Sequence, residues 1–312
     1  GFGSLLFIPL SALHSFNTFL IALFIIGCGL VFLETSANPY VTELGAKETA
    51  TSRLNFSQSF NGLGSLFATF IVGQFLFGAP IGERDVVVPY TILGILVLFI
   101  AFVFSRVYLP EMKHADSSDD EVKGTRIMKL FRYQPLFVFG LFALLAYEVS
   151  EISINSYFIN FMTGEGYMDD NTASVVLTIA LGFFMVGRFV GSWLMQYIRA
   201  EILLLICAAG SVTCMIVVLL GLGKVSMAAL ISNYLFEAIM FPTIFSLATK
   251  GLGRFTSSAS GVLCTAIVGG AVVPVVQGWA ADTYGLMISF VVSAICYVYI
   301  VFFAIKGYKA DE

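Results

Sequence analysis

Residues 32–45 have the sequence FLETSANPYVTELG. They follow a run from Gly1 to Leu33 that contains no Asp, Glu, Lys or Arg. A carboxylate (Glu34), an amide (Asn38) and a proline (Pro39) therefore occur where the chain otherwise suits lipid. Because a carboxylate at the centre of a membrane helix costs about 2.5–3.5 kcal/mol on insertion scales, this stretch predicts a polar interior within the membrane.

The composition sets the class of protein. The chain has 312 residues, of which 58% are hydrophobic and only 12% charged, with a mean hydropathy of +0.92, whereas soluble proteins carry roughly 25% charged residues. Its long charge-free runs suit membrane helices of about 20 residues better than barrel strands of about 10 alternating residues. We therefore expect an all-α membrane protein, with a helix fragment at 1–13 and complete helices near 17–40, 54–78, 88–108, 135–161, 173–198, 201–222, 226–249, 257–280 and 286–306.

Basic residues in alternate loops predict the orientation. One side of the membrane receives only Arg84 and Lys224, and Arg188 lies within a span. The other side receives Lys47, Arg53, Arg106, Lys113, Lys123, Arg126, Lys129, Arg132, Arg199, Lys250, Arg254, Lys306 and Lys309. Since cytoplasmic loops carry the excess of Lys and Arg, we expect the loop after the third complete helix and the C-terminus to be cytoplasmic.

Several functional classes find no support in the sequence. The five cysteines are scattered through apolar spans without a CxxC pair, and His14 and His114 form no metal-ligand cluster. No HExxH or GxSxG motif indicates an enzyme. We expect no cofactor, no metal and no nucleic-acid partner.

The chain contains an internal duplication. Glu34, Pro39 and Gln74 have counterparts 203 residues later, at Glu237, Pro242 and Gln277, without a gap. Repeats of this kind are common in transporters. The same offset places the partners of two and a half helices before Gly1, so we expect two six-helix bundles of which this chain lacks those helices. The expected domains are 1–108 for the rest of the N-terminal bundle, 109–134 for a cytoplasmic linker and 135–312 for the C-terminal bundle.

Polar side chains share helix faces in the first half. Glu34 and Asn38 are four residues apart and lie on one face. In RLNFSQSFNGLGS (53–65), the polar residues Asn55, Gln58, Asn61 and Ser65 keep to one side of the helix. Amides in membrane helices can also simply join neighbouring helices, at about 0.6 kcal/mol per bond. A carboxylate must instead be paired, hydrated or protonated, which favours a functional role for Glu34.

The second half shows a similar pattern. In YEVSEISINSY (147–157), Tyr147, Glu151 and Asn155 form a stripe with Glu148 alongside. Glu148 lies nearer the outer end of its helix, where reaching water is an alternative. Glu237 could be preserved by the duplication for packing alone.

Prolines and glycines add structural predictions. Pro39 and Pro242 each remove a main-chain donor, which kinks the helix and frees a carbonyl. GRFVG (187–191) supplies a GxxxG face for close helix packing. We expect its Arg188 to lie towards the cytoplasmic end, as a gate or as the partner of a helix end.

These motifs carry a resemblance. FLETSANPYVTELG, RLNFSQSFNGLGS and FPTIFSLATKGLG (241–253) resemble the fucose–proton and glucose/galactose symporter family of the major facilitator superfamily, from Gly1 to about residue 306. The resemblance implies a twelve-helix fold with alternating access and a central sugar cavity. It also implies that Glu34 recognises sugar and couples protons, and that Gln58 and Asn61 line the cavity. Glu151 falls where some members have an amide, and Phe241 where one has tyrosine.

The expected function is proton-coupled uptake of a hexose of the fucose or glucose/galactose type. The primary site residues are Glu34, Asn38, Gln58, Asn61, Glu151 and Asn155, and the secondary candidates are Tyr147, Glu148, Glu237 and Phe241. The alternatives are sodium-coupled or uncoupled sugar transport and a non-transporting membrane sugar sensor. We expect a monomer in a lipid bilayer, spanning the plasma membrane (the inner membrane of a bacterium) several times.

Overall fold

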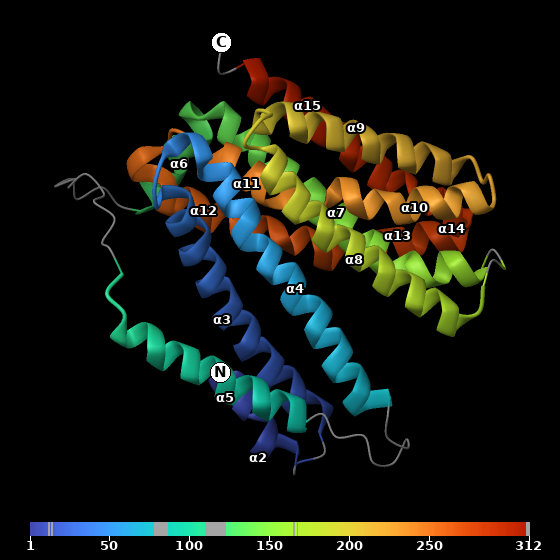
Figure 1. The fold of residues 1–312 in the computed structure, drawn as a ribbon, viewed down its shortest axis with the longest axis horizontal. Coiled ribbons are helices and arrows are strands. Elements are labelled where there is room, and N and C mark those ends of the chain that lie inside the picture. Colours follow the sequence, from blue (N-terminus) through green and yellow to red (C-terminus); the bar gives the residue numbers. More distant parts are fainter. Residues whose placement is uncertain are drawn as a thin grey trace. The chain divides into compact units, whose positions relative to one another are not determined.

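The computed structural model describes residues 1–11, 13, 15–77, 87–109, 123–164, 166 and 168–309. For 68–77, 123–126, 170–171, 254 and 307–309 the backbone alone is described. This part of the chain contains helices and no strand (Figure 1). Eight of its helical segments are long and apolar enough to cross a membrane. His14, His114 and half of the expected linker (110–122) lie outside the described residues, and so does the side chain of Gln74.

The helices form two compact units, each described here by itself. Unit 1 comprises Gly1–Ala37 and Gly64–Lys113, and unit 2 comprises Asn38–Leu63 and His114–Glu312. Two long helices contribute to both units: α3 (Phe16–Glu43) and α4 (Ala50–Phe77). The short helix η1 (Lys47–Thr49) precedes α4. The bundle boundaries expected from the duplication stay a prediction.

Unit 1 is organised around α5 (Val87–Arg106). The short helices α1 (Phe2–Leu5) and α2 (Phe7–Ser11) pack against it. The buried ring of Phe7 stacks on Tyr90 of α5, with a centroid distance of 4.0 Å, and meets Phe19 of α3 at 5.5 Å. Such aromatic pairs contribute about 0.5–1.5 kcal/mol beyond their buried area.

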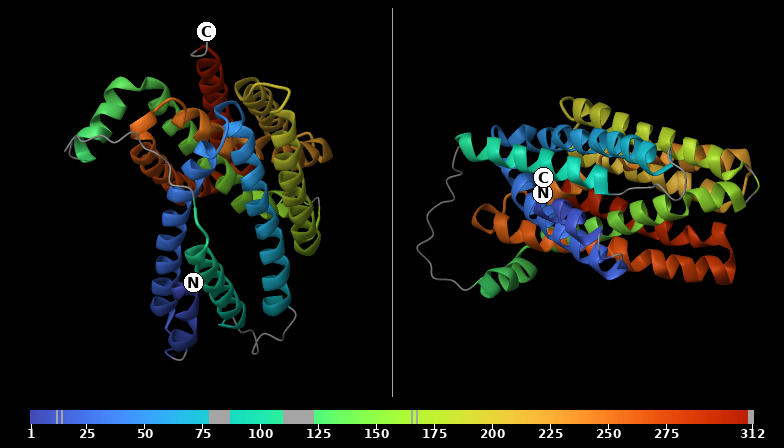
Figure 2. Two further views of the ribbon diagram at one scale, coloured as in Figure 1. Left: turned by 60° about the vertical axis from the view of Figure 1, so that its left-hand side comes forward. Right: turned by 90° about the horizontal axis from the view of Figure 1, so that it is seen from below.

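Unit 2 is built around α7 (Pro135–Gly164). The helices α8 (Asp170–Leu194), α11 (Met240–Thr249), α13 (Gly269–Tyr284) and α15 (Val291–Lys309) pack against α7, and α9 (Ala200–Leu219) packs against α10 (Lys224–Glu237) and α15. The two views in Figure 2 show α13 and α15, in orange and red, alongside the green α7. The remaining elements are α6 (Lys123–Tyr133), η2 (Gly253–Phe255), α12 (Thr256–Thr265), η3 (Ala266–Val268) and α14 (Leu286–Ser289).

The observed helices follow the predicted spans with instructive differences. The span predicted at 226–249 is divided into α10 and α11 by a break at residues 238–239. The span predicted at 257–280 contains a 3-10 turn at Ala266–Val268. The expected linker ends in a helix, α6, which the sequence analysis missed. Among its described side chains, at residues 127–133, only Leu130 is buried while Met128 stays exposed, so the sequence offers few apolar positions that would indicate a helix.

The GxxxG prediction for α8 is confirmed. A Cβ at Gly187 would lie 2.8 Å from Cβ of Ala238 and 2.9 Å from the carbonyl oxygen of Leu235. A Cβ at Gly191 would lie 2.1 Å from Cγ2 of Ile239. Only glycine allows this approach, and it brings α8 against the break between α10 and α11.

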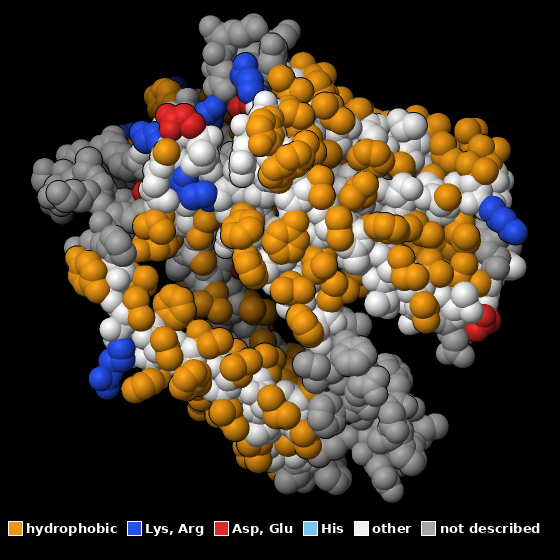
Figure 3. All heavy atoms as spheres, viewed as in Figure 1, with side chains coloured by type: hydrophobic (Ala, Val, Ile, Leu, Met, Phe, Trp, Pro, Cys, Tyr) orange, Lys and Arg blue, Asp and Glu red, His pale blue; other side chains and the backbone are white. Residues whose placement is uncertain are grey.

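The outer side of α8 is apolar. Large side chains spaced three or four residues apart are exposed along its whole length: Val175, Ile179, Phe183, Val186, Val190 and Trp193. On the face seen in Figure 3, hydrophobic side chains also cover α9 and α10. A helix that exposes an unbroken apolar stripe of this length is suited to a lipid surround.

Candidate substrate and proton site

Three of the predicted amides form a hydrogen-bonded chain in unit 2. Gln58 of α4 donates from Nε2 to Oδ1 of Asn38 in α3, at 2.9 Å, and its Oε1 accepts from Nδ2 of Asn61 at 3.1 Å. Asn38 and Gln58 are buried, whereas Asn61 is exposed. The amide nitrogen of Asn38 has no partner among the described residues. The chain thus runs from a buried end to an accessible one.

Glu34 precedes Asn38 by four residues in α3, so one helical turn separates the two side chains. Glu34 is half-buried in unit 1. Pro39 lies inside the same helix, which continues through it to Glu43.

The predicted stripe on α7 lies in the interior of unit 2. Tyr147 and Glu148 are buried, and Glu151 and Asn155 are half-buried. Asn155 accepts a hydrogen bond from the hydroxyl of Tyr234 in α10, at 2.8 Å. The ring of Tyr147 lies 6.0 Å from that of Phe241, centroid to centroid. The structure therefore brings Phe241 to this stripe.

Arg188 connects α8 to two other helices. Its guanidinium donates from Nε to the carbonyl of Ala238 at 3.1 Å and from NH1 to the carbonyl of Gln58 at 2.8 Å, and it lies over the ring of Phe184. Arg188 is buried, and it forms no ion pair with a carboxylate in the described part of the chain. Its observed partners are main-chain oxygens; the expected roles as a gate or a helix-end partner stay predictions.

Proline chemistry explains one of these bonds. In an uninterrupted helix the carbonyl of Ala238 would accept from the main-chain nitrogen of residue 242, but Pro242 has no N–H. The helix breaks at that point, and Arg188 supplies the missing donor. The predicted freed carbonyl is thus present, and it is satisfied by a cation rather than left open.

Glu237 ends α10 directly before this break. Its side chain is fully buried, and its Oε2 accepts from Nδ2 of Asn233 at 2.9 Å and from the hydroxyl of Tyr297 at 2.5 Å. The charges of Glu151, Glu237 and Arg188 lie within electrostatic range of one another. The polar residues of α7, α8 and α10 therefore form one cluster in the interior of unit 2.

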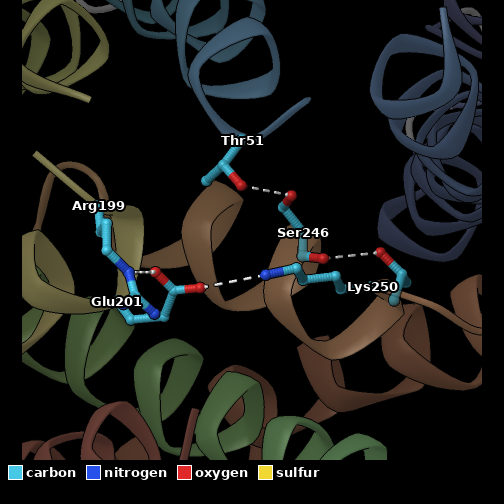
Figure 4. A network of polar contacts seen from close by, with 6 residues as sticks. Thr51, Arg199, Glu201, Ser246 and Lys250 are labelled. Carbon is cyan, nitrogen blue, oxygen red and sulfur yellow. Dashed lines mark hydrogen bonds and ion pairs between the residues drawn. The ribbon is translucent and has the colours of Figure 1, made fainter. Parts of the chain in front are cut away.

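Sequence reasoning missed a second set of contacts on α4. Thr51 and Ser246 share a hydrogen bond of 2.8 Å (Figure 4). Ser52 and Ser192 each donate to the main-chain oxygen of the other, at 2.8 Å. Asn55 donates to Thr243 at 3.1 Å. These bonds join the first turns of α4 to α8 and α11; we call this set the α4 seam.

The α4 seam lies beside an ion-pair group. Glu201 pairs with Lys250 at 3.4 Å and with Arg199 at 3.8 Å, as Figure 4 shows. Nearby, Arg53 donates to the carbonyls of Thr42 and Ala46 and so caps the end of α3. The polar pattern of residues 51–59 was visible in the sequence, but which helices it would meet was not.

The polar clusters lie inside a helical protein whose family is identifiable. The family model described as Major Facilitator Superfamily matches residues 1–267. The chain belongs to this superfamily.

Individual relatives are similar over almost the whole chain. The glucose/galactose transporter of Brucella abortus biovar 1 (strain 9-941) is 36% identical over 317 residues, which cover 99% of this chain and 76% of that protein. The L-fucose-proton symporter of Escherichia coli (strain K12) is 30% identical over 329 residues, which cover 97% of this chain and 74% of the symporter. These relatives are transporters, not enzymes.

Among solved structures, that of FucP, a Major Facilitator Superfamily transporter in the outward conformation, matches with a TM-score of 0.89 at 28% identity. The match covers 98% of this chain and 80% of that one. The fold expected from the sequence, an all-helical major facilitator architecture, is confirmed.

Proposed function

We propose that this protein carries a hexose together with protons across a membrane by alternating access. The observation that carries the proposal is the amide chain of Asn38, Gln58 and Asn61, with Glu34 one helical turn away. Relatives named glucose/galactose transporter and L-fucose-proton symporter support the substrate class and the coupling ion.

The side chains suit sugar hydroxyls. An amide offers both donors and acceptors, and so does a protonated carboxyl group. Protonated Glu34 could therefore bind a hydroxyl group, whereas ionised Glu34 would resist sealing in a dry occluded state. This difference in stability between the two protonation states would couple proton movement to sugar movement. Glu151, Asn155 and Tyr147 would supply polar groups from the second half.

The α4 seam is the proposed cytoplasmic closure. It joins α4 to α8 and α11 close to Lys250 and Arg199, basic residues that the positive-inside rule assigns to the cytoplasmic side. The similarity to FucP in the outward conformation supports a state closed on that side. Opening to the cytoplasm would break these hydrogen bonds, each of which contributes about 0.5–1.5 kcal/mol.

Transport in proteoliposomes tests the proposal. Adding a hexose to sodium-free vesicles should make the outer medium alkaline as sugar enters. Sugar entry without this change would eliminate proton coupling and leave sodium-coupled or uncoupled transport. Counterflow of labelled hexose separates the remaining class, because a sugar sensor would bind its ligand without exchanging it.

Orientation and assembly are further parts of the proposal. We place the C-terminus in the cytoplasm of a cell whose plasma membrane (in a bacterium, the inner membrane) holds the protein as a monomer in lipid. A reporter enzyme active only outside the cytoplasm, fused after Glu312, should be inactive. Light scattering of the purified protein should give the mass of one chain plus detergent.

A further inference from the structure

The carboxyl group of Glu237 has an unusual hydrogen-bond environment. Its side chain is 0% exposed. Its Oε2 accepts from both Asn233 and Tyr297, and Nδ2 of Asn233 also donates to the hydroxyl of Tyr297 at 3.0 Å. Its other oxygen, Oε1, is buried and has no partner among the described residues.

Among the described residues, no cation forms an ion pair with this group. Arg188 is within electrostatic range, but its hydrogen bonds go to the carbonyls of Ala238 and Gln58. The ion pairs of the described residues involve Glu201 and not Glu237. A buried carboxylate without a paired cation is costly, and such a group takes up a proton instead.

The surrounding groups do not change this balance. The titratable side chains within electrostatic range of Glu237 come from five helices: Tyr147 and Glu151 of α7, Arg188 of α8, Cys214 of α9, Tyr234 of α10 and Tyr297 of α15. Glu148 of α7 interacts with Tyr147 of this set. Arg188 is the one cation in this set, and Glu151 shares its field. One cation can offset the charge of one carboxylate. If Arg188 offsets Glu151, no counter-charge is left for Glu237.

A second observation indicates a missing hydrogen. Oδ1 of Asn233, on a side chain that is 0% exposed, is also a buried acceptor without a donor. Two neighbouring side chains thus carry unsatisfied acceptors, and each costs about 1–3 kcal/mol. A proton on Glu237 adds a donor. Protonation also removes the charge of the carboxylate, whose burial without a paired cation is the larger cost.

We propose that Glu237 is a proton-binding site of the C-terminal half, occupied in this conformation and hydrogen-bonded to Asn233 and Tyr297. A proton from water adds to one carboxylate oxygen, and no bond of the protein breaks. The evidence for this site is the geometry of unit 2. A role of the site in transport additionally rests on the proposed function. Glu237 is the repeat counterpart of Glu34, so each half of the protein would carry one protonatable carboxyl group, the first accessible and the second enclosed.

Infrared difference spectroscopy of the purified protein tests the proposal at pH 7, at which an exposed glutamate is ionised. Subtracting the spectrum of Glu237→Gln from that of the wild type should reveal the C=O stretching band of a protonated carboxylic acid. The matched control is Glu48→Gln, an exposed residue, which should remove carboxylate bands instead. If Glu237→Gln also removes carboxylate bands, Glu237 is ionised and the proposal is wrong.

A second variant keeps the test valid if Glu237→Gln does not fold. Tyr297→Phe removes one donor to Oε2, so the acid band should shift in frequency. An acid band that stays in place would overturn the assignment to Glu237. The Glu34→Gln variant separates this proposal from the transport proposal. It should keep the acid band of Glu237, whatever sugar-uptake measurements show about proton coupling.

Discussion

The two halves of the duplication treat the same motif differently. In the first, α3 continues through Pro39, and Glu34 is half-buried. In the second, the helix breaks at residues 238–239, and Glu237 is fully buried. Proline frees a carbonyl in both halves, but in the second half Arg188 binds that carbonyl.

This difference shows that two copies of the same motif can have different roles. A carboxyl group five residues before a proline can be an exchangeable proton carrier or an enclosed one. Packed neighbours decide which, because burial without a cation determines whether the group keeps its proton. The predictions below test this distinction, from the largest expected effect to the smallest.

The largest effect should come from Glu34→Gln. Glutamine cannot take up or release a proton, so accumulation of sugar against its gradient should be lost while exchange of labelled sugar persists. Uptake and counterflow in proteoliposomes measure the two activities. Glu48→Gln, at an exposed position, should leave both intact. Normal uphill uptake by Glu34→Gln would remove Glu34 from coupling and erase the contrast with Glu237.

Arg188→Ala should destabilise the second half strongly. It leaves the carbonyls of Ala238 and Gln58 without their side-chain donor in the interior of unit 2. Hydrogen bonds to a charged group contribute about 1.5–3 kcal/mol each, and this variant loses two. Thermal unfolding in detergent measures the loss. Arg199→Ala, whose side chain is 45% exposed, should cost far less; equal losses would mean that the break does not depend on Arg188.

Gly187→Ala tests the close approach of α8 to the break. The new methyl group would lie 2.9 Å from the carbonyl oxygen of Leu235, an atom of the main chain that cannot swing aside. Overpacking of this kind costs about 1–3 kcal/mol. Gly182→Ala in the same helix meets nothing within 4 Å and should be neutral or slightly stabilising. Unfolding temperatures that are the same for both variants would contradict the packing described here.

The smallest expected effect is a non-additive change in the free energy of unfolding when two substitutions are combined. Pro242→Ala restores a main-chain donor for the carbonyl of Ala238, so the loss of Arg188 should then cost less by about one hydrogen bond, or roughly 1 kcal/mol. A double-mutant cycle of Pro242→Ala with Arg188→Ala measures this coupling. The matched cycle with Pro39→Ala should be additive, because the hydrogen bonds of Arg188 go to Ala238 and Gln58 and not to the carbonyl that Pro39 frees. Additive free energies in both cycles would show that Arg188 does not replace the main-chain donor of the Ala238 carbonyl.

Much of the fold could be predicted because membrane helices leave a strong mark on sequence. A span of about 20 apolar residues is decided locally, since the bilayer forces each helix to satisfy its own main-chain groups. The predicted spans accordingly fall on observed helices such as α7 and α9. The break before Met240 was not placed, because Pro242 permits a kink without fixing the residue at which it occurs.

The candidate site was predictable in its residue types and only partly in its arrangement. Helical spacing placed Glu34 with Asn38 and Tyr147 with Glu151, since these pairs are four residues apart. Spacing within a helix could not reveal that Arg188 meets Gln58 or that Tyr297 meets Glu237, because 130 and 60 residues separate these partners. Such contacts depend on helix packing over the whole unit.

By itself, the sequence determined that this is a duplicated helical membrane protein with carboxyl and amide groups in its spans. It did so because lipid excludes charge and helical periodicity sorts residues onto faces. Only the tertiary structure decided which of those groups have partners, that Arg188 satisfies the carbonyl freed by Pro242, and that Glu237 is sealed away while Glu34 is not. Hydrogen-bond partners and burial depend on which helices pack together, and the order of residues within one helix does not determine that packing.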